Sequence, residues 1–274
     1  MSDKIIDSLN PKQKEAVVYC DGHELVLAGA GSGKTRVLTS KIAYLIGAKK
    51  VAPWRILALT FTNKAAKEMK TRVEKLLGSD LRGMEVSTFH AYGLRFLHRY
   101  PDALMKLGYP KRFVIFDRGD TRNVIKKILT QLDIDPRIMD AGAAIELISR
   151  VKTESNPVTM GPAIQTRWLP LYEKYRQHLL SQGALDFDDL MTLPLHILAT
   201  DKEVRERERS RLDWILVDEY QDVNRPQYLL LRCLVDSGRK IMVVGDPDQS
   251  IYGWRGADMS MIMNFANDFR GAKI

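Results

Sequence analysis

Short apolar runs alternate with longer segments of helical period near both ends of this sequence. The apolar runs predict β-strands at residues 24–28, 55–62, 84–88, 214–217 and 240–244. Apolar side chains recur every three or four positions in residues 35–46 and 63–77, which predicts two amphipathic helices that follow strands. Because strands that alternate with helices pair in parallel and are covered on both faces, the pattern predicts an α/β fold with a parallel sheet.

The pattern changes between residues 90 and 211, where helical period dominates. Apolar side chains from Val124 to Leu132 keep one such period, and prolines interrupt the stretch at intervals. No convincing strand stands out in this segment, and the strand pattern resumes only at Asp213. We therefore expect an all-helical subdomain, residues 90–211, inserted between a first part of the sheet domain, residues 1–89, and a second part, residues 212–274.

The composition is that of an ordinary folded protein with an excess of basic residues. The 274 residues are 45% hydrophobic and 28% charged, which suffices for a buried core. A net charge of +8 favours polyanionic partners such as nucleic acid, although it also fits an ordinary enzyme. No apolar run reaches the length of a signal peptide or membrane span, so we expect a cytoplasmic protein without a membrane partner. The two cysteines, Cys20 and Cys233, have neither disulfide-framework nor zinc-ligand spacing, and we expect inert thiols.

A glycine-rich stretch, AGAGSGKTRV at residues 28–37, joins the first predicted strand to the first long helix. It fits the phosphate-loop pattern A-x-x-x-x-G-K-T, with Ala28 in place of the usual first glycine. Glycines let backbone N–H groups converge on phosphate oxygens, Lys34 can reach the β and γ phosphates, and Thr35 can ligate Mg²⁺. The stretch predicts a nucleotide-binding loop made of Ala28, Gly29, Ala30, Gly31, Ser32, Gly33, Lys34 and Thr35.

Acidic residues follow a later strand, as the metal partner of such a loop requires. The run WILV, residues 214–217, leads directly into Asp218 and Glu219. One carboxylate of such a pair can hold the Mg²⁺ shell while its neighbour orients and deprotonates an attacking water, which favours hydrolysis over group transfer. Gln249 follows the next strand and is placed to sense a γ phosphate.

Several further motifs occur in a fixed order along the whole chain. They are LNPKQKEAV, LALTFTNKAAKEM, STFH, LDFDDL, ILVDEYQDVN and VVGDPDQSIYGWRGAD, in addition to AGAGSGKTRV. Together they resemble the N-terminal half of superfamily 1 DNA helicases of the UvrD, Rep and PcrA kind. The resemblance implies a RecA-like phosphate-loop motor domain, called 1A, formed by both ends of the chain, with an inserted helical domain, 1B. It also implies ATP hydrolysis with Mg²⁺ that drives 3′ to 5′ movement along single-stranded DNA.

The resemblance also assigns roles to individual residues. It places Gln13 and Arg36 beside the adenine, and it makes Asp218 the metal ligand and Glu219 the catalytic base. Gln249 would couple the γ phosphate to the DNA track. The residues that would line the DNA strand are Phe61, His90, Phe187, Tyr252, Trp254 and Arg255. Unpaired bases stack on aromatic side chains with about 1–3 kcal/mol per base, which suits this set.

Members of the family continue into a second RecA-like domain, whereas this sequence ends at NDFRGAKI. That domain supplies arginines to the γ phosphate, and an arginine finger is worth about 10³–10⁵ in rate. We therefore expect a fragment without its C-terminal helicase domains, which binds ATP and single-stranded DNA but hydrolyses ATP feebly and does not unwind duplex.

Three other functions stay open at this point. A GTPase or kinase is disfavoured because the sequence lacks an NKxD guanine motif. A non-catalytic module that docks a protein or DNA fits a chain without the second motor domain. The motor portion of a helicase-nuclease shares the same motifs.

Overall fold

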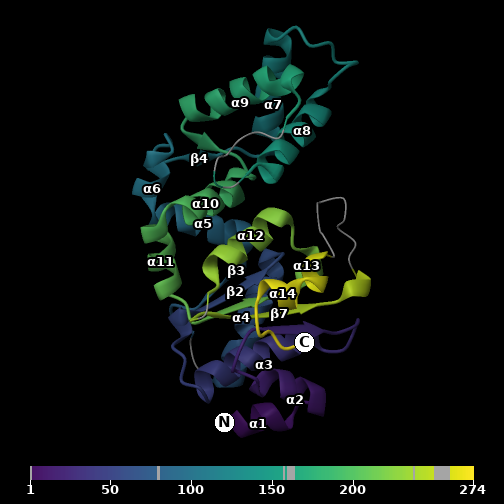
Figure 1. Cartoon of the computed structure of the whole chain (residues 1–274), viewed down its shortest axis with the longest axis vertical. Coiled ribbons are helices and arrows are strands. Elements are labelled where there is room, and N and C mark those ends of the chain that lie inside the picture. Colours follow the sequence, from purple (N-terminus) through teal and green to yellow (C-terminus); the bar gives the residue numbers. More distant parts are fainter. Residues whose placement is uncertain (1, 79–80, 157, 159–163, 237, 250–259) are drawn as a thin grey trace. The chain divides into compact units, whose positions relative to one another are not determined.

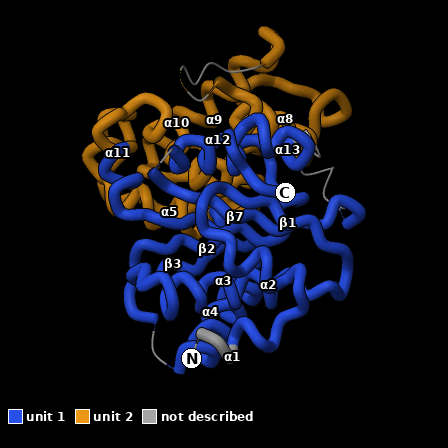
Figure 2. Tube along the Cα trace, turned by 60° about the horizontal axis from the view of Figure 1, so that its bottom comes forward, with its two compact units in different colours: residues 1–89, 206–274 blue, residues 90–205 orange. Residues whose placement is uncertain are grey.

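The chain folds into two units of different construction (Figure 2). The computed structural model describes residues 2–78, 81–156, 158, 164–236, 238–249 and 260–274. Unit 1 comprises residues 1–89 and 206–274, and unit 2 comprises residues 90–205. The second break thus falls before residue 211, within helix α11 (Lys202–Ser210). The reason is that the last turn of α11 packs on unit 1, where Arg209 Nε donates to the carbonyl of Cys233 at 2.8 Å.

A parallel sheet of five strands forms the centre of unit 1, as the sequence predicts (Figure 1). The strands are β1 (Glu24–Leu27), β2 (Ile56–Thr60), β3 (Glu85–Thr88), β6 (Trp214–Val217) and β7 (Lys240–Gly245), and their order is β1-β7-β6-β2-β3. The late strands β7 and β6 therefore lie between the early strands β1 and β2. Leu27 pairs with Gly245 and Val217 with Val243, so the carboxyl ends of β1, β7 and β6 meet at one edge.

Helices cover both faces of this sheet (Figure 1). One face carries α1 (Ser2–Asp7), α2 (Pro11–Val18), α3 (Lys34–Gly47) and α4 (Asn63–Leu77), and the other carries α12 (Arg225–Leu234), α13 (Ser260–Met263) and α14 (Phe265–Asp268). Four short 3₁₀ turns occur in the described residues, η1 (Pro53–Arg55), η2 (Thr166–Trp168), η3 (Tyr220–Asp222) and η4 (Pro247–Gln249).

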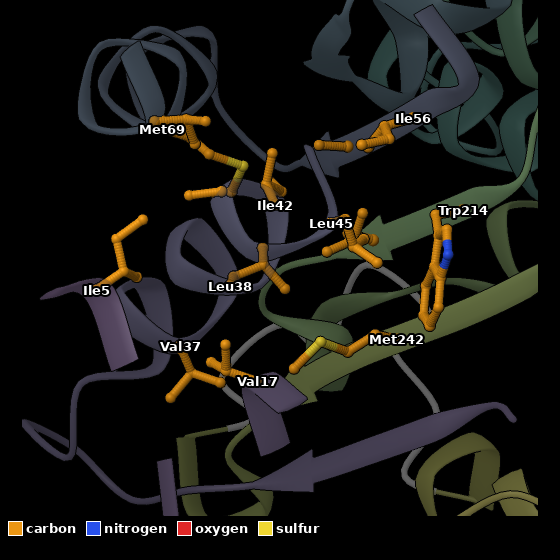
Figure 3. Close-up of a cluster of buried hydrophobic side chains, with 14 of the residues drawn as sticks. Ile5, Val17, Val37, Leu38, Ile42, Leu45, Ile56, Met69, Trp214 and Met242 are labelled. Atoms are coloured by element: carbon orange, nitrogen blue, oxygen red, sulfur yellow. The ribbon is translucent and has the colours of Figure 1, made fainter. Parts of the chain in front are cut away.

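The core beneath α3 consists of its apolar stripe and alternate residues of the strands. Figure 3 shows Leu45 of α3 near Trp214 and Ile42 beside Met69 of α4. These side chains, together with Leu38 and Met242, have less than a twentieth of their surface exposed. The predicted strand 55–62 is shorter in the structure because Thr62 is the N-cap residue of α4, and its side chain accepts the N–H of Ala65 at 3.1 Å. Gly78 ends α4 in the left-handed conformation, with φ +63°.

Unit 2 is mainly helical. Its helices are α5 (Phe89–Arg99), α6 (Pro101–Lys106), α7 (Arg118–Gln131), α8 (Ala141–Glu154), α9 (Leu169–Ser181), α10 (Asp189–Thr200) and the start of α11, up to Arg205. The expectation of a segment without strands is wrong, because β4 (Val114–Ile115) and β5 (Ala184–Leu185) pair in parallel. Strands of two residues are too short to leave a periodic signal in the sequence. Within the described part of the chain, no helix combines the length and apolar character needed to span a bilayer.

The close packing of α5 against α10 depends on a glycine. A Cβ atom added to Gly93 would lie 1.8 Å from the carbonyl oxygen of Leu190, which is far inside van der Waals contact. Only a residue without a side chain fits there, so Gly93 lets the backbones of these two helices approach each other.

Candidate nucleotide site at the carboxyl edge of the sheet

The loop between β1 and α3 is held by hydrogen bonds to backbone carbonyls, and Gly29 and Gly31 in it are exposed. Ala28 N–H donates to the carbonyl of Gly245 at 3.0 Å, and Ser32 Oγ donates to the carbonyl of Gly29 at 2.6 Å. A Cβ atom added to Gly29 or Gly31 would meet nothing within 4 Å. Gly33 is the N-cap residue of α3, with φ +91° and no side-chain cap. The loop therefore presents open backbone and the positive end of a helix.

Lys34, the first residue of α3, points to the ends of two other strands. Its Nζ atom lies 3.2 Å from Oδ2 of Asp246, 3.3 Å from Oε1 of Gln249 and 3.9 Å from Oε2 of Glu219. Only 8% of Lys34 is exposed. Three residues predicted from the sequence, Lys34, Glu219 and Gln249, are thus brought together, although Gln249 is 215 positions from Lys34 along the chain.

The two carboxylates after β6 lie in different environments. Asp218 is buried, and burial, followed by the charge of Glu219, raises its pKa to about 6. Glu219 is partly exposed, with 39% of its side-chain surface accessible, and its backbone is left-handed with φ +50°. Such a conformation is strained for a residue with a side chain, and it turns the carboxylate of Glu219 toward Lys34. A buried carboxylate with a raised pKa is the kind of group that a bound cation stabilises.

Two residues that sequence reasoning did not single out connect the strand ends. Gln221 Nε2 donates to Oε2 of Glu219 at 2.8 Å, and Gln221 Oε1 accepts the N–H of Asp246 at 2.9 Å. Asp246 in turn holds Lys34. Asp246 directly follows β7, and Gln221 lies in the turn η3 that follows β6. Ligand-binding residues gather beyond the carboxyl ends of strands in open α/β sheets, and that position is the signal that would have found them.

Gln13 and Arg36, predicted beside the adenine, both contact backbone near the loop. Gln13 Nε2 donates to the carbonyl of Ser32 at 2.9 Å, while its own backbone N–H is capped by Asn10. Arg36 donates to the carbonyl of Ser8. Thr35, the predicted metal ligand, lies half-buried in the first turn of α3 beside Lys34.

Buried polar atoms also occur beside the acidic pair. Among the described atoms, Oδ1 of Asp222 is buried without a hydrogen-bond partner. Burial and the charge of Glu219 raise the pKa of Asp222 to about 6. The edge of the sheet after β6 therefore holds more buried acidic oxygen than its protein partners satisfy.

The predicted DNA-binding residues fall in three places. Phe61 of unit 1 follows β2, and its ring centroid is 5.8 Å from that of Phe89. His90 and Phe187 of unit 2 are neighbours, with centroids 5.0 Å apart. The remaining predicted residues, Tyr252, Trp254 and Arg255, lie outside the described residues. Their contacts with DNA, like those of the other three, stay predictions.

Comparison with known proteins agrees with this arrangement. The profile of the UvrD/REP helicase N-terminal domain matches residues 9–270. The ATP-dependent DNA helicase PcrA of Bacillus subtilis is 43% identical over all of this chain, and those of Staphylococcus epidermidis and Staphylococcus aureus are 42% and 41% identical over 98% and 97% of it. The chain spans 37% of the length of these curated relatives. It belongs to the UvrD/REP helicase family, of which it comprises the N-terminal domain.

Proposed function

We propose that this chain binds ATP with Mg²⁺ at the carboxyl edge of β1, β7 and β6, as the motor part of a DNA helicase. The observation that carries the proposal is the position of Lys34, whose ammonium group lies within 4 Å of side chains that follow both β6 and β7. A phosphate chain seated on the loop 28–33 would lie between Lys34 and the acidic pair.

The residues present fit ATP and its metal. Open space over Gly29 and Gly31 admits phosphate oxygens to the backbone N–H groups. Mg²⁺ is usually held by one or two protein oxygens together with substrate phosphates, and Asp218 and Thr35 are the residues that would hold it here. When bound, the ion neutralises charge on the phosphates.

The chain's own groups divide the remaining tasks. Lys34 donates to the β and γ phosphates in exchange for its bonds to Asp246 and Gln249. Glu219, oriented by Gln221, accepts the proton of the attacking water. Gln249, which Lys34 releases in this exchange, senses the γ phosphate.

We propose further that Phe187, His90 and Phe61 contact single-stranded DNA, together with Tyr252, Trp254 and Arg255. Phe187 has 58% of its surface exposed, which is unusual for an aromatic residue without a ligand to cover it. Movement from 3′ to 5′ is part of the proposal and rests on the family resemblance alone. Because the matched relatives are much longer than this chain, we expect it to bind both ligands, hydrolyse ATP weakly and leave duplex intact.

Titration with a fluorescent ATP analogue tests the nucleotide site. Lys34→Ala should weaken binding roughly 10-fold to 150-fold, which corresponds to about 1.5–3 kcal/mol for charge-assisted hydrogen bonds. Lys14→Ala, at an exposed position of α2, is the matched control and should bind like the wild type. Equal affinity of the Lys34→Ala variant would contradict the proposal.

Fluorescence anisotropy with a labelled oligonucleotide tests the DNA site. Binding should weaken linearly on a log–log plot as salt rises, because neutralised phosphates release counterions. A salt-independent signal, or none, would favour a module that docks a protein instead.

A further inference from the structure

A buried cluster of charges lies in unit 2. Lys152 of α8 places its Nζ atom 2.7 Å from Oδ2 of Asp186 and 2.8 Å from Oδ1 of Asp189. Tyr175 of α9 donates its hydroxyl hydrogen to Oδ2 of Asp186 at 2.8 Å. All of these side chains are at least nine-tenths buried. The cluster thus joins α8 and α9 to the turn that precedes α10.

The two aspartates also close that turn on each other. The N–H of Asp186 donates to Oδ2 of Asp189 at 3.1 Å, and the N–H of Asp189 donates to Oδ1 of Asp186 at 3.0 Å. Two like charges at this separation repel each other, and Lys152 is the cation that lies between them. Although burial alone lowers the pKa of Lys152, the two carboxylates outweigh it and raise that pKa well above its usual value. The lysine therefore stays charged.

The turn carries an exposed aromatic ring. Phe187 lies between the two aspartates in sequence, 58% exposed, and its ring is tilted by 44° against His90 at a centroid distance of 5.0 Å. Burial lowers the pKa of His90, so its ring is mainly neutral near pH 7 and remains able to stack. The residues on both sides of Phe187 are fixed, while its own ring faces outward.

Stability alone does not account for such a cluster. Moving three charges out of water costs several kcal/mol per ion in general, and well-packed apolar residues often serve as well or better. The surroundings already form an apolar core, in which Leu171, Leu179 and Ala184 are almost fully buried. The ionic cluster adds geometric specificity. Two hydrogen-bonded carboxylates and one cation restrict the conformation of the turn more than apolar contacts do.

We propose that Lys152 is a positioning residue, which locks the Asp186–Asp189 turn so that Phe187 and His90 form a platform for an unpaired base. The inference rests on the proposed function, since it assigns the platform to single-stranded DNA. Lys152 itself does not touch the DNA, and it acts through the orientation of Phe187.

A double-mutant cycle on the whole chain tests this role. The charge-neutral variant Lys152→Met, Asp186→Asn, Asp189→Asn keeps the cluster's shape, and Phe187→Ala removes the platform. Each should weaken binding of an oligo-dT strand by roughly 5-fold to 150-fold, the loss of one stacked base. Combined, they should weaken it no more than Phe187→Ala alone. Lys174→Met, at an exposed position of α9, is the control and should bind like the wild type.

A spectroscopic signal separates positioning from general loss of structure. In protein labelled with fluorophenylalanine, the ¹⁹F resonance assigned through Phe187→Leu should move in the charge-neutral variant and return in Lys152→Arg. Binding of the ATP analogue should stay unchanged throughout. Should the triple variant fail to fold, Tyr175→Phe removes only the phenol bond to Asp186 and should give a smaller shift and a smaller loss in the same direction.

The outcomes distinguish the inference from the proposed function. If Phe187→Ala weakens DNA binding while the charge-neutral variant binds normally, the DNA site stands and the role of Lys152 is wrong. Additive losses would likewise overturn it. If Phe187→Ala binds DNA as tightly as the wild type, Phe187 is no platform and both proposals fail for this residue.

Discussion

The ammonium nitrogen of Lys34 lies 3.2 Å from the carboxylate of Asp246, a residue that is only 2% exposed. The same carboxylate accepts the N–H of Asp248 at 3.1 Å through its other oxygen. Asp246 is therefore held rigidly beside the cation that phosphates are proposed to bind. A buried negative charge at this point competes with phosphate for Lys34, and it also repels the phosphate.

Asp246→Asn should tighten nucleotide binding in the absence of Mg²⁺. The change keeps the shape and removes one negative charge, and relief of about 1 kcal/mol corresponds to roughly fivefold in affinity. Titration with the fluorescent ATP analogue in EDTA measures it. Asp248→Asn, an exposed neighbour, should change little. Equal or weaker binding by Asp246→Asn in EDTA would contradict the competition between this carboxylate and phosphate for Lys34.

Gln221→Met should destabilise unit 1 without disturbing its sheet. The change leaves the buried N–H of Asp246 without its acceptor, and an unsatisfied buried group costs about 1–3 kcal/mol. Urea unfolding followed by circular dichroism gives the free energy. Asn267→Met removes an exposed amide and serves as control. Equal unfolding free energies for the two variants would show that the hydrogen bond of Gln221 to Asp246 does not contribute to stability.

Much of the fold follows from patterns in the sequence, because each strand of unit 1 is a short apolar run and each flanking helix has a clear period. The sequence also predicts the phosphate loop, because its glycines, lysine and threonine have a defined spacing. The sequence does not predict that Asp246 pairs with Lys34, because the two residues come together only when β7 lies beside β1 in the sheet. Strand order is a property of the whole sheet, and no local pattern encodes it.

The sequence also does not predict which charged residues are buried. Lys41 in TSKIA has the composition of a solvent-facing helical residue, yet it is 0% exposed and pairs with Glu24. Lys152 and Asp186 likewise look like surface residues until α8 and the turn before α10 come together. Long-range pairing decides whether an ionisable residue is buried, and sequence periodicity records only the average preference for the surface.

Gly33→Ala should cost more stability than Gly29→Ala. At Gly33 the backbone has φ +91°, and an added Cβ atom would lie 2.8 Å from Nε2 of Gln13, which would have to leave the carbonyl of Ser32. We expect a loss of about 1–3 kcal/mol in the free energy of unfolding, from backbone strain and the lost bond. Gly29→Ala should stay within about 0.5 kcal/mol of the wild type, since its site is open.

The Gly29→Ala variant has a second use. Because it is expected to fold normally, any loss of nucleotide affinity reports obstruction of the loop by the added methyl group. Comparable stability losses for both glycine variants would contradict the assigned loop geometry.

Glu24, at the start of β1, illustrates a case in which burial outweighs an ion pair. Its carboxylate lies 3.2 Å from Nζ of Lys41, which also donates to the carbonyls of Ala16 and Tyr19. Burial nevertheless raises the pKa of Glu24 to about 7, against the attraction of Lys41 and Lys273, with a smaller contribution from Glu15. The folded state therefore binds a proton that the unfolded state has already released above about pH 4.3.

The stability of the wild type should for this reason fall, relative to Glu24→Gln, as pH rises from about 4.5 to 7, and level off above. The sign follows because the folded state binds more protons in that window, and the shift corresponds to a change of about 2–3 kcal/mol between pH 5 and pH 8. His23, whose pKa is lowered by burial, contributes an opposite slope that both proteins share and that cancels in the difference. Urea unfolding at several pH values measures it, with Glu173→Gln, at an exposed position of α9, as control. Parallel pH profiles for the wild type and Glu24→Gln would show that Lys41 keeps Glu24 ionised, and that the pair, not burial, governs this end of β1.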